Sequence, residues 1–295
     1  MEKQFYTVVI EAEENGKDSF IQVYFAWAGD LGEAIHRVVR AAKEKESISN
    51  PLATEADPYE YEDFGRDRED ITGYPDLEVF VARNRYYYPA EDTFHAPPGI
   101  ILSCIENDSF DPGDLHPGYT CESGDGGLVT ITAVVPGAGL LDTFIALASI
   151  MPSIVVSWVT LCAHYENTGT VSMYTHEKLA SPAAIERFLK EHTVDILENG
   201  HVKFTVYDNE GKTNLVITDH KEIQILTYSD KIRTDVCGLL DSLGLEEDGD
   251  LPQIGSHFYH WHYKPVTAEK RAGLTELLEA EGFSFWKEFA EENDV

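Results

Sequence analysis

An uncharged segment, Thr143 to Ala163, limits the folds available to this chain more than any other feature. It is long enough to cross a bilayer as a helix, which takes about 20 apolar residues. However, Pro152 interrupts the segment, and the residues that follow it are mostly β-branched. No Lys or Arg lies between Arg85 and Lys178 to anchor a membrane span. We therefore expect a buried helix, a break at Pro152 and a buried strand.

The strand expected after Pro152 has apolar residues at both odd and even positions. Alternation places Val155, Ser157 and Val159 on one face and Ile154, Val156 and Trp158 on the other. A strand that is apolar on both faces is typical of the interior of a sheet. The pattern therefore predicts an inner strand with both faces buried.

The remaining periodicity predicts an α+β protein with mainly antiparallel sheets and packed helices. Residues 4–13 and 20–27 form a hairpin pattern around Asn15-Gly16, and Asp30 with Glu33 marks the start of a helix. Ser181 and Ser229 are expected to cap two later helices, and Gly244 to end the second. Further strands are expected at 77–88, 99–105, 128–135, 170–174, 202–207, 213–218 and 222–228, and C-terminal helices from about Thr267 and Ser284.

Changes in composition divide the chain into three parts. Residues 1–135 are expected to form an N-terminal α+β body, interrupted by an acidic insertion at 46–76 that contains three prolines. Residues 136–244 are expected to form a second α+β body. Residues 245–295 comprise an aromatic segment and a helical appendage.

The balance of charge says most about function. Asp and Glu number 53 against 22 Lys and Arg, so the formal net charge is −31. Because 43 % of the residues are hydrophobic, the chain is not a disordered acidic tail. Its field repels nucleic acid and anionic membranes, so we expect neither direct nucleic-acid binding nor membrane binding. A basic protein surface is the partner that this charge favours.

Acidic and aromatic residues alternate most densely within the insertion. Aromatic side chains supply contact energy at interfaces, and acidic side chains steer a protein toward a basic partner. The sequence therefore predicts a partner-binding surface there. Its residues are Tyr59, Glu60, Tyr61, Glu62, Asp63, Phe64, Asp67, Glu69 and Asp70.

A histidine cluster, His257, His260 and His262, is the main candidate for a metal site. In a strand, His260 and His262 share one face and His257 points to the other. Two imidazoles on one face can begin a metal site that a carboxylate elsewhere completes. Cys162 and His164 also lie close in sequence, but we expect them to face opposite ways and to form no catalytic pair.

The sequence contains no motif for a cofactor, and none is predicted. Neither a nucleophile elbow nor a complete phosphate-binding loop is present. Four scattered cysteines, Cys104, Cys121, Cys162 and Cys237, form no CxxC pair, which favours reduced thiols. The first residues lack the basic and apolar regions of a signal peptide, so we expect a cytoplasmic protein.

Three functions follow from these features. The favoured one is non-enzymatic: an acidic protein that blocks the basic surface of a nuclease, toxin or defence protein, as an inhibitor, an immunity or anti-defence factor, or a nucleic-acid mimic. The second is a metal-dependent hydrolase that uses the histidines of the 257–262 segment. The third is a structural subunit of a homo-oligomer with its aromatic patches buried between copies.

Overall fold

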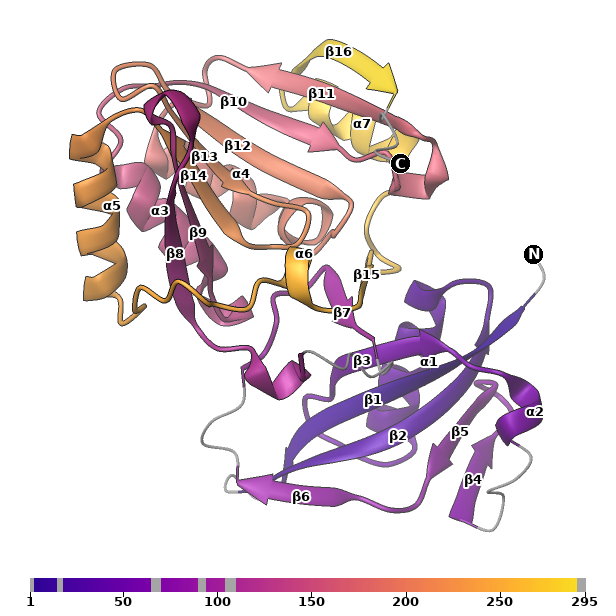
Figure 1. The fold of residues 1–295 in the computed structure, drawn as a ribbon. Coiled ribbons are helices and arrows are strands. Elements are labelled where there is room, and N and C mark those ends of the chain that lie inside the picture. The colour runs from indigo at the N-terminus through magenta and orange to yellow at the C-terminus, as the bar shows by residue number, and fades with distance from the viewer. Residues whose placement is uncertain (1–2, 15–17, 65–69, 90–93, 104–109, 291–295) are drawn as a thin grey trace.

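Two eight-stranded sheets form the framework of the molecule (Figure 1). The computed structural model describes residues 3–14, 18–64, 70–89, 94–103 and 110–290. Among these residues, all strand pairs are antiparallel except β3 with β7 and one isolated parallel bridge, Tyr119 with Glu247. Helices pack on both sheets. The predicted α+β class with mainly antiparallel sheets is confirmed.

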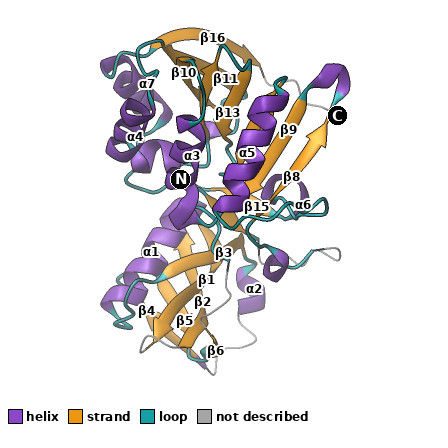
Figure 2. Cartoon of the chain, turned by 90° about the vertical axis from the view of Figure 1, so that its left-hand side faces the viewer, coloured by secondary structure: helices purple, strands orange, loops and turns teal. Residues whose placement is uncertain are grey.

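The first sheet has the order β15-β7-β3-β1-β2-β5-β4, and β6 also pairs with β2. Its elements are β1 (Gln4–Glu14), β2 (Asp18–Ala28), α1 (Leu31–Glu44), β3 (Leu52–Pro58), α2 (Tyr61–Phe64), β4 (Ile71–Tyr74), β5 (Val79–Ala82), β6 (Tyr86–Pro89), β7 (Ile100–Leu102) and β15 (His260–His262). Helix α1 packs along one face of this sheet (Figure 2).

Local signals in the sequence explain why α1 begins where it does. The Asp30 carboxylate accepts a hydrogen bond from the Glu33 backbone N–H at 2.8 Å, and the Glu33 carboxylate accepts one from the Gly29 N–H at 2.6 Å. These bonds satisfy backbone donors that lack a partner in the first turn. The predicted cap is confirmed, and the helix buries Ala34, Ile35, Val38, Ala41 and Ala42.

The predicted insertion at 46–76 is more regular than its composition indicated. It supplies β3, α2 and β4, and β3 pairs with β1 in the middle of the sheet. One acidic residue of β3, Asp57, is only 3 % exposed. Its carboxylate accepts hydrogen bonds from Ser103 Oγ and from Trp261 Nε1, both at 2.8 Å. Specific donors on neighbouring segments therefore allow an acidic stretch to enter the sheet.

The second sheet has the order β16-β11-β10-β12-β13-β14-β9-β8. Its strands are β8 (Gly118–Ser123), β9 (Val129–Val134), β10 (Ile154–Leu161), β11 (Thr170–His176), β12 (Val202–Asp208), β13 (Thr213–Ile217), β14 (Ile223–Thr227) and β16 (Ser284–Ala290). Its helices are α3 (Leu140–Ser149), α4 (Pro182–Glu191), α5 (Asp230–Ser242) and α7 (Arg271–Ala280), and the short α6 (Ile254–His257) leads toward β15. Side chains of α3, α4, α5 and α7 share one buried core with the sheet.

The caps predicted for α4 and α5 are confirmed. Ser181 and Ser229 each accept a hydrogen bond from the backbone N–H three residues later, at 3.3 Å. After α5, Gly244 has a φ of 81°, which suits the left-handed turn that ends a helix.

The boundaries of the two bodies differ from the predicted divisions at residues 135 and 245. Strands β8 and β9 precede residue 135 but belong to the second sheet, because β9 pairs with β14. Conversely, β15 lies within 245–295 but joins the first sheet through β7. The chain therefore passes between the two sheets more often than it would if each body were one continuous stretch of sequence.

The C-terminal appendage contains one helix rather than two. Helix α7 agrees with the helix expected from about Thr267, but the helix expected from Ser284 is wrong, since residues 284–290 form β16. Gly282, with a φ of 93°, separates the two elements. Pairing with β11 and the strand preference of Phe285, Trp286 and Phe289 outweigh the helical spacing of these aromatic residues.

The uncharged segment lies within the second body as α3 followed by β10. The predicted inner strand is confirmed, because β10 lies between β11 and β12. The prediction that both its faces are buried is wrong: Ser157 and Val159 are 0 % exposed, whereas Val156 and Trp158 on the other face are half-buried. The helices cover only one face, and the pairing with β12 is irregular between Ile154 and Val156. Among the described residues, no helix is long and apolar enough to cross a membrane.

The two bodies meet where three backbone segments approach one another closely. The Tyr263 N–H donates to Gly99 O at 2.8 Å, and the Gly200 N–H donates to Tyr263 O at 2.9 Å. A Cβ atom on Gly200 would lie 1.8 Å from Gly99 O. Only glycine fits at position 200 without moving a backbone segment.

We predict that Val159→Asp destabilises the protein by about 4 kcal/mol or more, because it buries a carboxylate without a partner. Val156→Asp, on the half-buried face of the same strand, is expected to cost only about 1 kcal/mol. Urea unfolding of both variants measures the difference. Equal losses would contradict the one-sided burial of β10.

We predict that Gly200→Ala destabilises the protein by at least about 2 kcal/mol, because the new methyl group overlaps Gly99 O. Gly249→Ala is the control, since no atom outside its chain neighbours lies within 4 Å of a Cβ there. Thermal unfolding compares the two variants. A normal melting temperature for Gly200→Ala would show that the junction is looser than the structure has it.

Candidate metal centre

Five histidines gather where β15 meets the second body. His260 and His262 come from β15, His220 from the turn between β13 and β14, His164 from the segment after β10, and His201 from the residue before β12. Figure 1 shows β15 in the segment of the chain that connects the two bodies. The rings of His164 and His262 stack with centroids 3.8 Å apart. The cluster therefore unites segments that are far apart in sequence.

His220, His260 and His262 form the group best suited to hold a metal ion. One ring nitrogen from each lies within 4.8 Å of the corresponding nitrogens of the other two. All three side chains are partly exposed, so solvent reaches the group. Three protein ligands with access to solvent are typical of an open metal site, whereas structural zinc sites are closed by four ligands.

The Nδ1 atom of each of these three rings lies near an oxygen atom. His260 Nδ1 lies 2.8 Å from Phe258 O, and His262 Nδ1 lies 2.7 Å from Gly200 O. His220 Nδ1 lies 3.4 Å from Asp219 Oδ1. An Nδ1–H that donates to such an oxygen leaves the lone pair on Nε2 for a metal ion. This is the usual second contact of a metal-binding histidine.

Burial disfavours the charged form of three histidines of the cluster. Desolvation, with His164 adding to it, lowers the pKa of His262 to about 3. Desolvation also lowers the pKa of His220, although Asp219 opposes this. Half-buried His201, next to the group, has its pKa lowered to about 3 by desolvation. Neutral imidazoles offer the lone pairs that a metal ion requires.

The turn that carries His220 is held by backbone and side-chain contacts. The Thr218 N–H donates to Glu222 O at 2.9 Å, and the Glu222 carboxylate accepts from the Ile254 N–H at 2.6 Å. This second bond fixes α6 against the turn. A Cβ on Gly255 of α6 would lie 2.9 Å from His220 Nδ1, so glycine at this position leaves room for the imidazole ring.

A second group, Cys162, His164 and Asp219, lies beside the three histidines, with its ligand atoms within 4.8 Å of one another. The expectation that Cys162 and His164 face opposite ways is wrong, because Cys162 Sγ and a ring nitrogen of His164 lie within 4.8 Å of each other. Burial raises the pKa of the Cys162 thiol to about 12, so it stays protonated. Burial also opposes the charge on Asp219, but Lys203 Nζ, 3.1 Å away, holds the pKa of that carboxyl below its usual range.

Of the three predicted metal ligands, the structure brings together His260 and His262. His257 lies instead at the end of α6, where its Nδ1 accepts from the Gln253 N–H at 2.9 Å and its ring contacts Phe110. His220 occupies the place that sequence reasoning gave to a carboxylate from elsewhere. Nothing in the spacing connects His220 with His260, since the fold alone joins the β13–β14 turn to β15.

Several aromatic residues of the predicted partner-binding segment pack within the protein itself. Phe64 is 5 % exposed, and Tyr59, Tyr61 and Phe64 join an aromatic cluster on the face of the first sheet opposite α1. The other members of that cluster are Phe5, Phe25, Trp27 and Phe80.

The acidic residues of this segment lie differently from its rings. Glu60, Glu62 and Asp70 are exposed, and Asp63 is part of α2. Asp67 and Glu69 lie outside the described residues. The acidic side chains, rather than most of the rings, therefore face solvent.

Neither the models of known protein families nor the curated proteins nor the solved structures include a match to this chain.

Proposed function

We propose that this protein binds a divalent transition metal ion through His220, His260 and His262. The observation that carries the proposal is the arrangement of these rings: three ring nitrogens lie within 4.8 Å of one another while each Nδ1 faces an oxygen. A histidine whose Nδ1–H is engaged in this way is oriented to bind a metal through Nε2.

The residues favour zinc among the available ions. Imidazole suits Zn²⁺, Cu²⁺, Ni²⁺ and Fe²⁺, whereas Mg²⁺ and Ca²⁺ prefer oxygen ligands. Zinc readily accepts three histidines with a fourth position left for solvent or substrate. An imidazole ligand brings no negative charge to the ion, so a bound ion would keep its full positive charge inside a strongly acidic protein.

A hydrolytic reaction is the chemistry that such a site supports best. A zinc ion in an open three-histidine site lowers the pKa of bound water toward neutrality. The chain's own residues would orient the site: Gly200 O and Phe258 O fix two imidazoles, and the stacked ring of His164 supports His262. Asp219 Oδ1, 3.1 Å from Lys203 Nζ and 3.4 Å from His220 Nδ1, would orient the third imidazole.

We predict that the purified protein binds one zinc ion and that His220→Ala or His262→Ala weakens binding at least about a hundredfold, since each removes a direct ligand. His257→Ala is the matched control, because His257 lies outside the cluster, and it should bind zinc normally. Titration calorimetry and elemental analysis measure affinity and stoichiometry. Unchanged affinity in His220→Ala, or loss in His257→Ala, would show that a different set of residues binds the ion.

We also propose a second function, which rests on the net charge of −31: binding to a basic protein surface. Exposed Glu60 and Glu62 on and beside α2 would steer such a partner. A nuclease, toxin or defence protein with a nucleic-acid-binding surface fits this charge, and the protein would act on it as a blocking inhibitor. The two functions are separable, because α2 contributes no residue to the group of His220, His260 and His262.

We predict that changing Glu60, Glu62 and Asp63 together to Lys weakens binding to the partner by at least about tenfold and lowers the association rate, while the melting temperature stays within a few degrees. Rising ionic strength should slow association of the unaltered protein, because screening removes long-range steering. The partner is first captured at low salt and identified, and the variants are then compared by surface plasmon resonance. Equal association rates for the unaltered protein and the triple variant would show that α2 is not part of the interface.

A further inference from the structure

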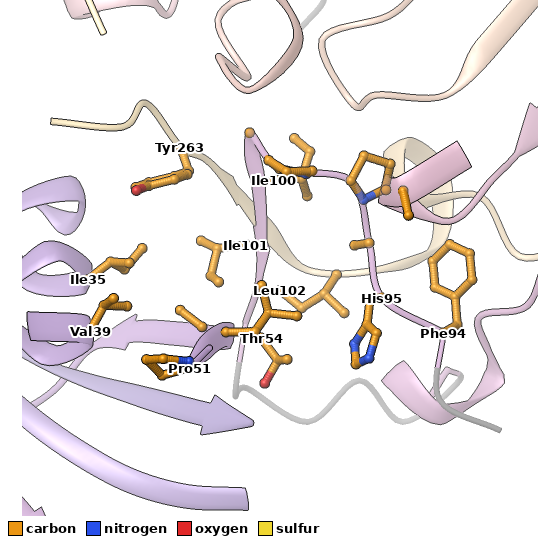
Figure 3. A pocket seen from close by; sticks show the side chains of 18 residues that line it. Ile35, Val39, Pro51, Thr54, Phe94, His95, Ile100, Ile101, Leu102 and Tyr263 are labelled. Carbon is orange, nitrogen blue, oxygen red and sulfur yellow. The ribbon is translucent and has the colours of Figure 1, made fainter. Parts of the chain in front are cut away.

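A cavity of about 470 Å³ lies between α1, β3 and β7 (Figure 3). It is separate from the histidine cluster, because Tyr263 faces the cavity whereas His262, one residue earlier, faces the cluster. The walls are largely apolar and include Ile35, Val39, Leu52, Phe94, Ile101 and Leu102. Its size and lining are typical of pockets that hold a small molecule.

The cavity has one polar side. His95 lies on the side opposite Ile35 and Val39, next to Phe94 (Figure 3). His95 Nδ1 lies 3.4 Å from Glu11 Oε2, and within the described part of the chain that nitrogen makes no aligned hydrogen bond. Glu11 is itself only 5 % exposed, on β1. A buried carboxylate beside Nδ1 favours the tautomer with its proton there, which leaves Nε2 as an acceptor.

A path from solvent into the cavity exists. Leu52 lines the cavity and is 41 % exposed, and Ala138, on another side, is exposed as well. The cavity is thus reached from the surface without opening either sheet. Apolar space of this size is costly to leave unfilled, because the lining atoms lose their packing partners.

We propose that this cavity binds a neutral amphipathic molecule: an apolar chain or ring system with a single hydroxyl group that donates to His95. The volume lies within the range of pockets that hold small organic molecules. Two features disfavour a ligand with a carboxylate group. Buried Glu11 lies next to His95, and the net negative charge of the protein repels anions. The site therefore selects alcohols over fatty acids of the same length.

Titration calorimetry of the full chain with 1-decanol tests the proposal, and decanoate at pH 7 is the comparison. We expect one saturable site for 1-decanol and at least about tenfold weaker binding of decanoate. Ala53→Leu and Ala138→Leu each enlarge a lining residue and so reduce the space in the cavity, and each should weaken 1-decanol binding at least about tenfold. His95→Phe keeps the ring but removes the acceptor, and should reduce the preference for the alcohol over decane.

Ala183→Leu is the matched control, since Ala183 is exposed on α4 away from the cavity. Should Ala53→Leu fail to fold, Ala138→Leu still tests the site, because its side chain starts from an exposed position. Absence of saturable 1-decanol binding, equal binding of decanoate, or normal binding in both cavity variants would overturn the proposal. These outcomes leave the zinc measurement untouched, because no cavity variant replaces a histidine of the metal centre.

Discussion

The close approach of Gly200 to Gly99 is the constraint on which the junction of the two bodies depends. Because neither residue carries a Cβ, Tyr263 exchanges backbone hydrogen bonds with both, at 2.8 Å with Gly99 and 2.9 Å with Gly200. That pairing brings β15 against the second body and sets the positions of its side chains on either side. One side of β15 then faces the histidine cluster, and the other, through Tyr263, faces the cavity. Both candidate sites therefore follow from one backbone contact.

The distribution of charge separates the interior of the junction from the surface. The surface is strongly acidic, yet the junction buries Lys221, whose ammonium donates to Ile196 O at 3.1 Å and Val202 O at 3.0 Å. Desolvation lowers the pKa of this lysine to about 7. Lys203 similarly neutralises Asp219 beside the histidines. These two lysines therefore satisfy buried oxygens of the junction instead of offsetting the acidic groups of the outer surface.

Local signals in the sequence predicted much of the fold. The predictions that were wrong or incomplete concern residues whose structure depends on contacts with residues distant in sequence. Asp30, Ser181 and Ser229 cap their helices through bonds to residues three positions away, so short motifs suffice. Residues 284–290 become a strand only by pairing with β11, more than a hundred residues earlier. His220 likewise joins His260 through the fold alone. Periodicity recognises an amphipathic segment, but it cannot show which distant partner completes it.

The candidate metal centre and the junction share one residue, Gly200, and this couples them energetically. His262 donates through Nδ1 to Gly200 O, while the Gly200 N–H holds Tyr263. His220 comes from the second body and His260 from a strand of the first sheet, so an ion bound by both would span the junction. A ligand that binds only the folded arrangement stabilises it by an amount that grows with ligand concentration over the dissociation constant. A bound zinc ion would therefore hold the two sheets in their relative positions as well as activate a water molecule. The three histidines would form the site only while β15 stays packed against the second body.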